Sequence, residues 1–588
     1  MQSLALKPHR LPQVAPTLPF VRNGFQCVNE ATMVQPCQNS TRKKYRCFIQ
    51  LAILTIPALM LLFPEVKDRL GSSGFFPSVH RNLKHDMHSS AAKSFHGAKD
   101  ALDQFVVRKK DRLFLNGEAF RFISFNVPNL HVVEDETWHR VSQWEQEDAL
   151  ETISRMGGQV VRIYPMSIVG GLNNGTYTHI LGKGMYNEAL FQDLDRLLVV
   201  AHRLEIRVII PFIDHWEWWG GVSQFARLFN ASFSDFYESP LIKAGFLDFV
   251  EYLLMRKNTL TGQLYRDDPT ILAWETGNEL DYVNDDTPHT NTHLSAPLML
   301  PSLAVMDKWT SELAAFLKKR DPNHLVIDGR LLNNRDVSRM QLLDPHIDLI
   351  SDHFYPNTDF SFEARLTRML SFSKRHKPFL VGEFGMVSSQ TMDALAKRVI
   401  EEPAVAGALL WSLRSHSAQG GFYWHYEYDD FWAYHYLGFD SNPGTEEKKV
   451  MAVVEKHAYA IRNQTVPAPT IPRPPKLIDG STTQAIAWQG SVGAQHYELE
   501  RKEVALGYQL DTGMTASGAD RTSTWQEGKW IRISNNLSDS MNPYVPFMDA
   551  TAQPGKIYEY RIYAVSSAGR SAPSPTMSIH ASSAASRP

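Results

Sequence analysis

Between residues 105 and 463, short apolar runs rich in β-branched residues alternate with longer amphipathic stretches. This alternation is typical of βα units around a parallel sheet. The stretch 188–205 illustrates the helices, because its leucines recur on one helical face. We expect eight strands, at 120–127, 160–165, 207–214, 271–279, 325–329, 347–355, 378–385 and 407–413. Eight such units predict an α/β fold of the (β/α)8 TIM-barrel type.

In most of these runs the apolar part comes first and polar or aromatic side chains follow at the carboxyl end. They are Asn126, Arg162, Asp214, His215, Asn278, Glu279, His353, Tyr355, Glu383 and Trp411. Because the carboxyl ends of all barrel strands open at one mouth, we expect these residues to line one pocket. An open doubly wound sheet would gather its strand ends along a crevice, but no glycine-rich phosphate loop supports that alternative.

Cleavage of a glycosidic bond requires a pair of carboxyl groups, and Glu279 and Glu383 are our candidates for that pair. One carboxyl protonates the departing oxygen, and the other attacks the anomeric carbon or activates water. Both would enter the mouth from opposite walls, at a reach that suits the separation of about 5–5.5 Å needed for retention of configuration. Asn278 is expected to bind a sugar hydroxyl beside the reacting carbon.

The neighbours of the two glutamates predict different protonation states. Arg162 and Tyr355 are expected to hold Glu383 ionised, since a cation and a hydroxyl donor both favour the carboxylate. Trp274 and Leu280 adjoin Glu279 in sequence, and apolar surroundings would keep its pKa raised, as an acid requires.

Five short motifs carry a resemblance to a known family. They are Val-Val-Arg-Ile at 160–163, Trp-Glu-Thr-Gly-Asn-Glu at 274–279, His-Phe-Tyr-Pro at 353–356, Val-Gly-Glu-Phe-Gly at 381–385 and Leu-Leu-Trp-Ser at 409–412. Over roughly residues 105–460, the chain resembles family 5 of glycoside hydrolase clan A, most closely its β-mannanase-like members. The stretch Phe-Ile-Asp-His-Trp-Glu-Trp-Trp-Gly-Gly at 212–221 resembles the loop after strand three of plant and fungal endo-mannanases.

The resemblance implies a retaining hydrolase of β-1,4-linked mannan or glucomannan that acts by double displacement without a cofactor. It makes Glu279 the acid/base and Glu383 the nucleophile. It places Arg162, Asn278, His353 and Tyr355 in an inner polar shell and Trp411 under the reacting sugar. Asp214 and His215 stand where the resemblance leads us to expect an asparagine pair, so a β-glucan hydrolase or a transglycosylase of the same clan stays open. A membrane-anchored protein that only binds carbohydrate is a further alternative.

Aromatic residues cluster after the third and eighth expected strands. They are Trp216, Trp218 and Trp219 in the first group, and Tyr423, Trp424, Tyr426, Tyr428, Phe431 and Trp432 in the second. Flat rings stack on pyranose faces, so both groups, together with His215 and Asn126, predict binding positions in a cleft for a polymer. Packing under a loop is the alternative for the first group, and an interface patch is the alternative for the second.

Charge and composition exclude other classes. The formal net charge is −3, which argues against nucleic acid as a partner. All three cysteines precede residue 48, so the remaining chain forms no disulfide or thiolate metal site. His215 and His353 lack a zinc-binding pattern around them, so we predict no metal. The predicted partners are a polysaccharide and a membrane, with no obligatory protein partner.

The membrane prediction rests on residues 48–64, which begin with sixteen uncharged residues behind Arg42, Lys43, Lys44 and Arg46. We expect a transmembrane signal-anchor there, with 1–47 as a cytoplasmic leader, 65–104 as a stalk, and the catalytic domain on the luminal or extracellular side. A long cleaved signal of a secreted protein and a buried helix of a cytoplasmic protein are the alternatives. Glycosylation triplets begin at Asn174, Asn230, Asn463 and Asn536.

After the barrel region, the proline-rich stretch 464–475 predicts a stiff linker. Residues 476–588 predict a small all-β sandwich, with short alternating runs at 485–490, 496–502, 530–534 and 558–569. Trp488, the run Tyr-Glu-Tyr-Arg-Ile-Tyr-Ala-Val at 558–565 and the Ala-Gly-Arg-Ser at 568–571 resemble a fibronectin type III domain.

Overall fold

The computed structural model describes residues 101–135, 137–172, 175–280, 301–332, 336–356, 361–427, 431–439, 446–504, 528–539 and 545–582. The chain divides into two units, Met1–Phe95 and His96–Pro588, and every described residue belongs to the second. The predicted leader, the signal-anchor and nearly all of the stalk therefore lie outside the described residues. Within the described ranges, no helix has the length and apolar character needed to cross a membrane.

Eight parallel strands form a closed barrel, as predicted. They are β4 (Phe122–Asn126), β5 (Val160–Arg162), β8 (Arg207–Pro211), β9 (Ile271–Glu275), β10 (Leu325–Asp328), β11 (Leu349–Phe354), β12 (Phe379–Phe384) and β13 (Val405–Leu410). The ring closes where β13 pairs with β4, with Leu409 opposite Ser124. Every residue of these strands is buried, which is why they read as continuous apolar runs rather than as alternating ones.

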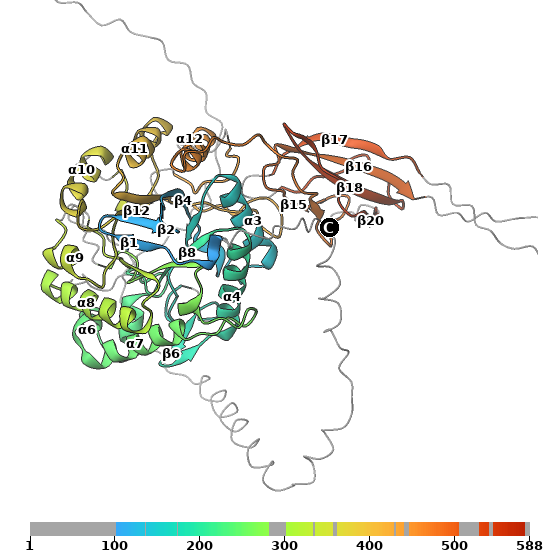
Figure 1. The fold of residues 1–588 in the computed structure, drawn as a ribbon. Helices are drawn as coiled ribbons and strands as arrows, with labels where there is room; N and C mark the ends of the chain where they lie inside the picture. Colours follow the sequence, from blue (N-terminus) through green and yellow to red (C-terminus); the bar gives the residue numbers. More distant parts are fainter. Residues whose placement is uncertain are drawn as a thin grey trace, which may run out of the picture. The chain divides into compact units, whose positions relative to one another are not determined.

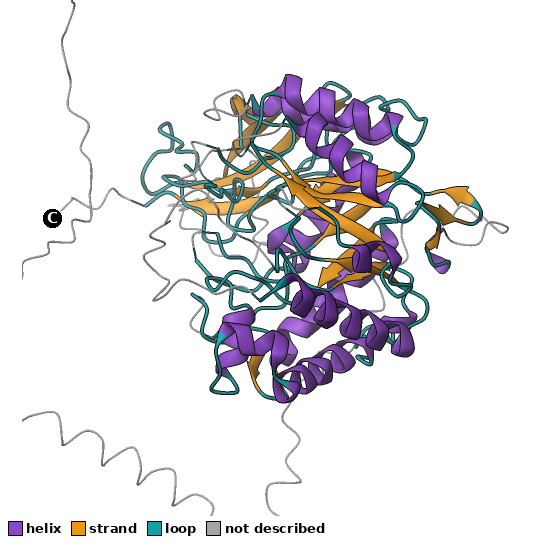
Figure 2. Ribbon diagram, turned by 90° about the vertical axis from the view of Figure 1, so that its left-hand side faces the viewer, coloured by secondary structure: helices purple, strands orange, loops and turns teal. Residues whose placement is uncertain are grey.

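Helices surround this barrel (Figure 1), and Figure 2 shows them outside the strands. The longer ones are α3 (Gln143–Arg155), α4 (Glu188–Arg203), α7 (Pro240–Leu254), α8 (Leu303–Arg320), α10 (Phe362–Ser373), α11 (Ser389–Glu401) and α12 (Glu447–Ala460). Shorter helices are α5 (Val222–Arg227), α6 (Phe233–Glu238) and α9 (Arg339–Leu343). The leucines of α4 lie buried against the strands, as its periodicity predicted.

Apolar side chains fill the amino-terminal end of the barrel. A small sheet of β1 (Val107–Lys109), β2 (Arg112–Leu115) and β3 (Glu118–Ala119) contributes Leu113 to a cluster with strand residues such as Leu272 and Ile327. Because this end is packed, a substrate must enter at the carboxyl ends of the strands. A second hairpin, β6 (Ile180–Gly182) with β7 (Met185–Tyr186), precedes α4.

The C-terminal module has its own sheets and core. Its strands are β14 (Lys476–Leu477), β15 (Trp488–Gln489), β16 (His496–Val504), β17 (Ile531–Leu537), β18 (Ile557–Ser566), β19 (Gly569–Arg570) and β20 (Met577–His580). β16 to β20 form one antiparallel sheet, and β14 pairs with β15. Trp488, Tyr497 and Ile562 share a buried cluster. Strands overlap all four predicted runs, which confirms those strands.

Candidate active site

Glu279 reaches the barrel mouth from a short segment beyond β9. The prediction that this strand runs to residue 279 is wrong, because β9 ends at Glu275. Beyond this strand, backbone hydrogen bonds still connect the segment to both neighbouring chain segments, among them those from Asn278 N–H to the Ile213 carbonyl (2.7 Å) and from Leu280 N–H to the Gly329 carbonyl (3.3 Å). Between them Glu279 has a φ of 53°, a conformation unfavourable for a residue with a side chain. Such strain persists where the surroundings impose it, and here it accompanies a carboxyl group that lines the mouth.

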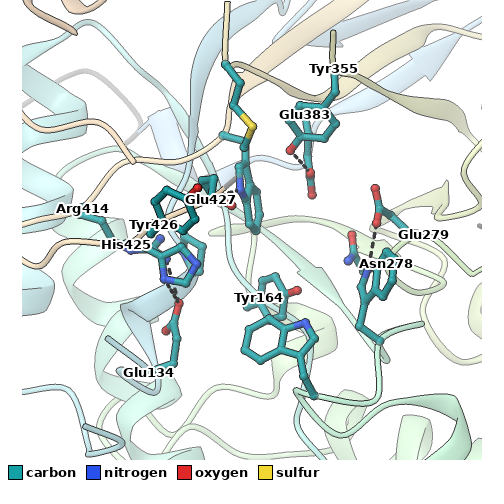
Figure 3. Close-up of a pocket in the computed structure, with 15 residues that line it drawn as sticks. Glu134, Tyr164, Asn278, Glu279, Tyr355, Glu383, Arg414, His425, Tyr426 and Glu427 are labelled. Carbon is teal, nitrogen blue, oxygen red and sulfur yellow. Dashed lines mark hydrogen bonds and ion pairs between the residues drawn. The ribbon is translucent and has the colours of Figure 1, made fainter. Parts of the chain in front are cut away.

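Glu383 lies within β12, directly beside His353 of β11. Its two carboxylate oxygens have separate donors. Arg162 Nη1 donates to Oε1 at 2.9 Å, and the Tyr355 hydroxyl donates to Oε2 at 2.5 Å. The carboxylate is therefore fixed in orientation at the wall of the mouth (Figure 3).

The two glutamates meet around His353. A carboxylate oxygen of each glutamate and a ring nitrogen of His353 all lie within 4.8 Å of one another. His353 Nδ1 is 2.8 Å from Glu279 Oε1 and 3.4 Å from Glu383 Oε2. The structure thus brings together two carboxyl groups that are 104 positions apart in the sequence (383 − 279).

Arg162 is the buried centre of the surrounding hydrogen bonds. It donates to Glu275 through Nε (2.6 Å) and Nη2 (3.1 Å), and to the side-chain oxygens of Asn278 (2.8 Å) and Asn126 (3.2 Å). Asn126 in turn donates to the backbone carbonyl of Gly382, next to Glu383. The sequence analysis missed Glu275. A buried arginine needs a buried carboxylate partner, so the first glutamate of the 274–279 motif was an available signal.

The pKa shifts of the two glutamates are opposite to those expected from the sequence. Burial raises the pKa of Glu383, and the charges of His353 and Arg162 only partly oppose it. For Glu279, burial would also raise the pKa, but hydrogen bonds from His353 and Trp216 outweigh it and the pKa is lowered. Trp274 does not provide the apolar surroundings expected for Glu279. Its indole N–H donates to Asp321, whereas the groups that bond to Glu279 are His353 and Trp216.

The two carboxyl groups open into a cavity of about 320 Å³. It is lined by Pro128, Glu134, Tyr164, Trp216, Trp218, Asn278, Glu279, Tyr355, Glu383, Met386, Trp411, Arg414, His425, Tyr426 and Glu427. Trp216 donates its indole N–H to Glu279 Oε2 (2.8 Å), and Trp411 donates its own to Glu427 Oε1 (2.9 Å). Both rings are therefore held at defined angles beside the reacting groups.

Some predicted binding residues lie behind this wall. Trp219 is fully buried, donates to the Pro165 carbonyl and packs edge-on against Tyr164, so direct sugar contact is corrected to a packing role. The same correction applies to Trp424, which is buried against His435, and to His215, which packs edge-on against Trp216. Asn126, Arg162 and His353 also lie outside the cavity lining, although each bonds to the groups described above. Tyr428 lies outside the described residues.

Several lining residues were not singled out from the sequence. They are Pro128, Glu134, Tyr164, Met386, Arg414, His425 and Glu427. Most come from loops, where no periodicity shows which side chain faces inward. The position of Tyr164, two residues beyond Arg162 and just past the end of β5, was a usable signal.

Among the residues that the structure describes, two groups of side chains have distances that suit a metal ion, and a buried arginine lies beside each. In Glu279, His353 and Glu383, the guanidinium of Arg162 bonds to Glu383. In Glu134, Asp135 and His425, Arg414 lies 2.9 Å from Glu134 and 3.0 Å from Asp135. Each guanidinium already supplies the positive charge that a cation would bring to these carboxylates.

Comparisons with known proteins identify the family of this chain. The family model described as GH family 5 beta-mannosidase-like matches residues 103–438. Mannan endo-1,4-beta-mannosidase 1 of Arabidopsis thaliana is 28% identical over 365 residues, which is 54% of this chain and 81% of that protein. Mannan endo-1,4-beta-mannosidase 2 of Oryza sativa subsp. japonica is 29% identical over 399 residues, covering 60% and 83%.

Among solved structures, the endo-1,4-beta-mannanase from Rhizomucor miehei is 20% identical, with a TM-score of 0.49, and the match covers 61% of this chain and all of that one. The family match extends over more than half of the 588 residues and includes both glutamates. The chain therefore belongs to the β-mannosidase-like group of glycoside hydrolase family 5, as its five motifs indicated.

Proposed function

We propose that this glycoside hydrolase cleaves internal bonds of β-1,4-linked mannan or glucomannan, with retention of configuration at the anomeric carbon. The observation that carries the proposal is the approach of Glu279 and Glu383 to within 4.8 Å. Retaining enzymes hold their carboxyl groups about 5–5.5 Å apart, whereas inverting enzymes need about 6.5–9.5 Å to admit a water molecule. The names of the plant relatives support mannan as the substrate.

In the first step, a carboxylate oxygen of Glu383 forms a bond to the anomeric carbon of the bound sugar. The bond from this carbon to the glycosidic oxygen breaks, and that oxygen takes a proton from Glu279. The product is a sugar esterified to Glu383, with the rest of the polysaccharide released. Arg162 and Tyr355 hold the Glu383 oxygens in place for this attack.

In the second step, Glu279 removes a proton from a water molecule that enters on its side of the sugar. The water oxygen bonds to the anomeric carbon and the ester bond to Glu383 breaks, which restores the original configuration. In this proposal, His353 supplies the proton needed for the first step. Both carboxylates raise the pKa of His353 despite its burial, and its Nδ1 lies 2.8 Å from Glu279 Oε1. A proton passed from Nδ1 to Glu279 would make Glu279 the acid.

The sugar itself would rest on Trp411, whose indole ring is held by Glu427. Asn278 has a fixed amide orientation, because its oxygen accepts from Arg162 (2.8 Å) and its nitrogen donates to Asp214 (3.0 Å). The remaining amide hydrogen is suited to a sugar hydroxyl beside the reacting carbon. Such a bond strengthens as charge develops in the transition state.

The test is hydrolysis of mannan, glucomannan and cellulose, with product analysis and NMR of the first anomer released. We expect short oligosaccharides from mannan and glucomannan, a rapid fall in viscosity, and the β-anomer first. Cleavage of cellulose alone would make the protein a β-glucanase. Products longer than the substrate would indicate a transglycosylase, and binding without turnover would favour a carbohydrate-binding protein.

We also propose that residues 48–64 anchor the chain in a membrane, with the hydrolase domain 105–463 on the luminal or extracellular side. The basic residues before the apolar run support this orientation. Asn230, Asn463 and Asn536 are exposed, as glycosylation acceptors must be. Residues 476–588 would form a fibronectin type III-like sandwich beyond the linker 464–475. A mass shift on removal of N-glycans, together with protease protection in intact vesicles, tests the location.

A further inference from the structure

Asp214 is a fully buried carboxyl group behind the wall that carries the catalytic acid. It lies just beyond the end of β8 and forms a backbone bridge with Asn278, the residue before Glu279. Its Oδ1 accepts a hydrogen bond from Asn278 Nδ2 at 3.0 Å. Figure 3 shows Asn278 and Glu279 in the wall of the cavity. Asp214 is therefore attached, through a backbone and a side-chain contact, to the segment that holds the acid.

Asn278 separates Asp214 from the cation of the site. Its amide oxygen accepts from Arg162 at 2.8 Å, while its nitrogen donates to Asp214. Arg162 directs its other hydrogen bonds to Asn126, to Glu275 and to Glu383. Among the hydrogen bonds of the described residues, the guanidinium is thus shared by two carboxylates that it contacts directly, and Asp214 is not one of them.

The groups that hydrogen bond to Asp214 are uncharged. Burial raises the pKa of Asp214 to about 7 and the charge of Glu279 adds to this effect, whereas hydrogen bonds from neutral groups only partly oppose it. These groups are the Asn278 amide, the Trp216 backbone and the Tyr164 hydroxyl. The adjacent His215 brings no cation at pH 7, because burial lowers its own pKa. A buried carboxyl group with neutral partners keeps its proton to higher pH than an exposed one, so Asp214 changes from neutral to negative near pH 7.

The interaction between Asp214 and Glu279 acts in both directions. Because the charge of Glu279 makes Asp214 harder to ionise, an ionised Asp214 makes a proton at Glu279 harder to remove by the same free energy. In the proposed mechanism that proton is shared with His353, 2.8 Å away. Asp214 has a charge with which to hold it only on the alkaline side of its own ionisation.

We propose that Asp214 is a positioning residue for the catalytic proton, whose negative charge keeps that proton between His353 and Glu279 to higher pH than the pair alone could. This inference rests on the proposed function. It concerns the alkaline side of the activity profile alone. At acidic pH Asp214 is neutral, so the nucleophile Glu383 ionises without its influence.

The experiment is a pH series of kcat/KM for the full chain and for Asp214→Asn and Asp214→Ala, with melting temperatures as a check on folding. The substrate is β-1,4-mannohexaose, because its departing sugar needs the acid proton. Both substitutions remove the charge, and asparagine keeps an oxygen that accepts from Asn278. We expect the alkaline limb to move to lower pH by about 0.5–1 unit in both variants, less than a charge in direct contact would cause, while the acidic limb stays in place. In Asp214→Ala alone, the maximal kcat/KM should also fall by about 2- to 10-fold, because Asn278 loses a hydrogen-bond partner.

Two further variants support the comparison. Glu363→Gln, at an exposed position of α10, is the control and should keep the wild-type profile. Tyr164→Phe leaves Asp214 in place but removes a hydroxyl that favours its ionised form. Asp214 then ionises at higher pH, and the alkaline limb should move in the same direction as in Asp214→Asn. This variant decides the question if neither substitution of Asp214 folds.

Alkaline limbs that stay in place would overturn the inference, because they would mean that Asp214 only supports Asn278. A shift of both limbs, or a shift to higher pH, would overturn it as well. A measurement without substrate separates this failure from failure of the proposed function. NMR of the chain labelled with 15N-histidine follows the ionisation of His353, whose signal is identified by its loss in His353→Ala. The pKa of His353 should be lower in Asp214→Asn than in the wild type, whether or not mannohexaose is cleaved, and an unchanged value contradicts the role of Asp214.

Discussion

Arg162 binds Glu275 through two parallel hydrogen bonds of 2.6 and 3.1 Å, and both side chains are about 1% exposed. This pair fixes the position of the other groups in the site, since Arg162 also donates hydrogen bonds to Asn278 and Glu383. Bidentate pairing fixes the guanidinium plane and so the direction of the remaining N–H groups. The Arg162–Glu275 pair therefore sets the orientation of Asn278 and Glu383, the two residues proposed to contact the sugar.

We expect Glu275→Ala to lower the free energy of unfolding by about 3–5 kcal/mol, because it removes the main counter-charge of a buried arginine. Chemical denaturation of the variant measures this loss. The matched control is Glu312→Ala, which removes the exposed pair with Lys243 and should cost at most about 1 kcal/mol. Equal effects of the two substitutions would contradict the central role of the Arg162–Glu275 pair.

Glu383→Ala should abolish turnover of mannan while leaving the melting temperature close to wild type. Azide or formate can then occupy the space of the lost carboxyl and attack the sugar from that side, giving a product of inverted configuration. In Glu279→Ala, the Glu383 ester still forms from aryl substrates, whose leaving group needs little protonation, and azide should give a product of retained configuration. NMR of the two azide products assigns the two roles. The same configuration from both variants would mean that the roles are wrongly assigned.

The barrel could be predicted because its strands are buried on both faces. Such strands appear as continuous apolar runs between amphipathic helices, and all eight were found this way. Their ends were less accurate. β9 stops at Glu275 because the chain then leaves the ladder, and the left-handed conformation of Glu279 has no counterpart in hydrophobic pattern.

The sequence predicted that Glu279 and Glu383 meet, from the position of both glutamates near strand ends and from family-like motifs, and the structure brings them together. Neighbouring tryptophans were harder to separate. Trp218 lines the cavity and Trp219 is buried beneath it, although both follow the same strand. Glu134 and His425 were missed because their partners come from another loop, and a sequence alone does not show which loops meet.

The strand-eight loop is linked to the C-terminal module through His416, which bonds to Asp148 of α3 and to Asp539 of the module. Burial lowers the pKa of His416, but the charges of the two aspartates outweigh it and raise the pKa to about 10. In the unfolded chain the pKa of a histidine is about 6.5. The ion pairs of His416 therefore stabilise the fold fully below about pH 6.5, and this stabilisation is lost as the pH rises toward 10. We expect His416→Gln to lower the melting temperature at pH 6 more than at pH 10. An equal effect at both values would contradict the charged state of His416.

His353 should control the pH dependence of catalysis, because its positive charge acts on both glutamates. It lowers the pKa of Glu279 and opposes the effect of burial on Glu383. In His353→Ala both carboxyls lose this cation, so burial dominates and both pKa values of the pair rise. The acidic limb of kcat/KM reports ionisation of the nucleophile, and the alkaline limb reports loss of the acid proton. Both limbs should therefore move to higher pH by about 1 unit or more, within the range of a nearby charge.

A pH series with an aryl β-1,4-mannobioside as substrate measures this shift, and the control Glu363→Gln, at an exposed position of α10, should reproduce the wild-type profile. If both limbs stayed in place while kcat fell, His353 would act by position alone, and the shared proton between His353 and Glu279 would not be the source of the catalytic acid.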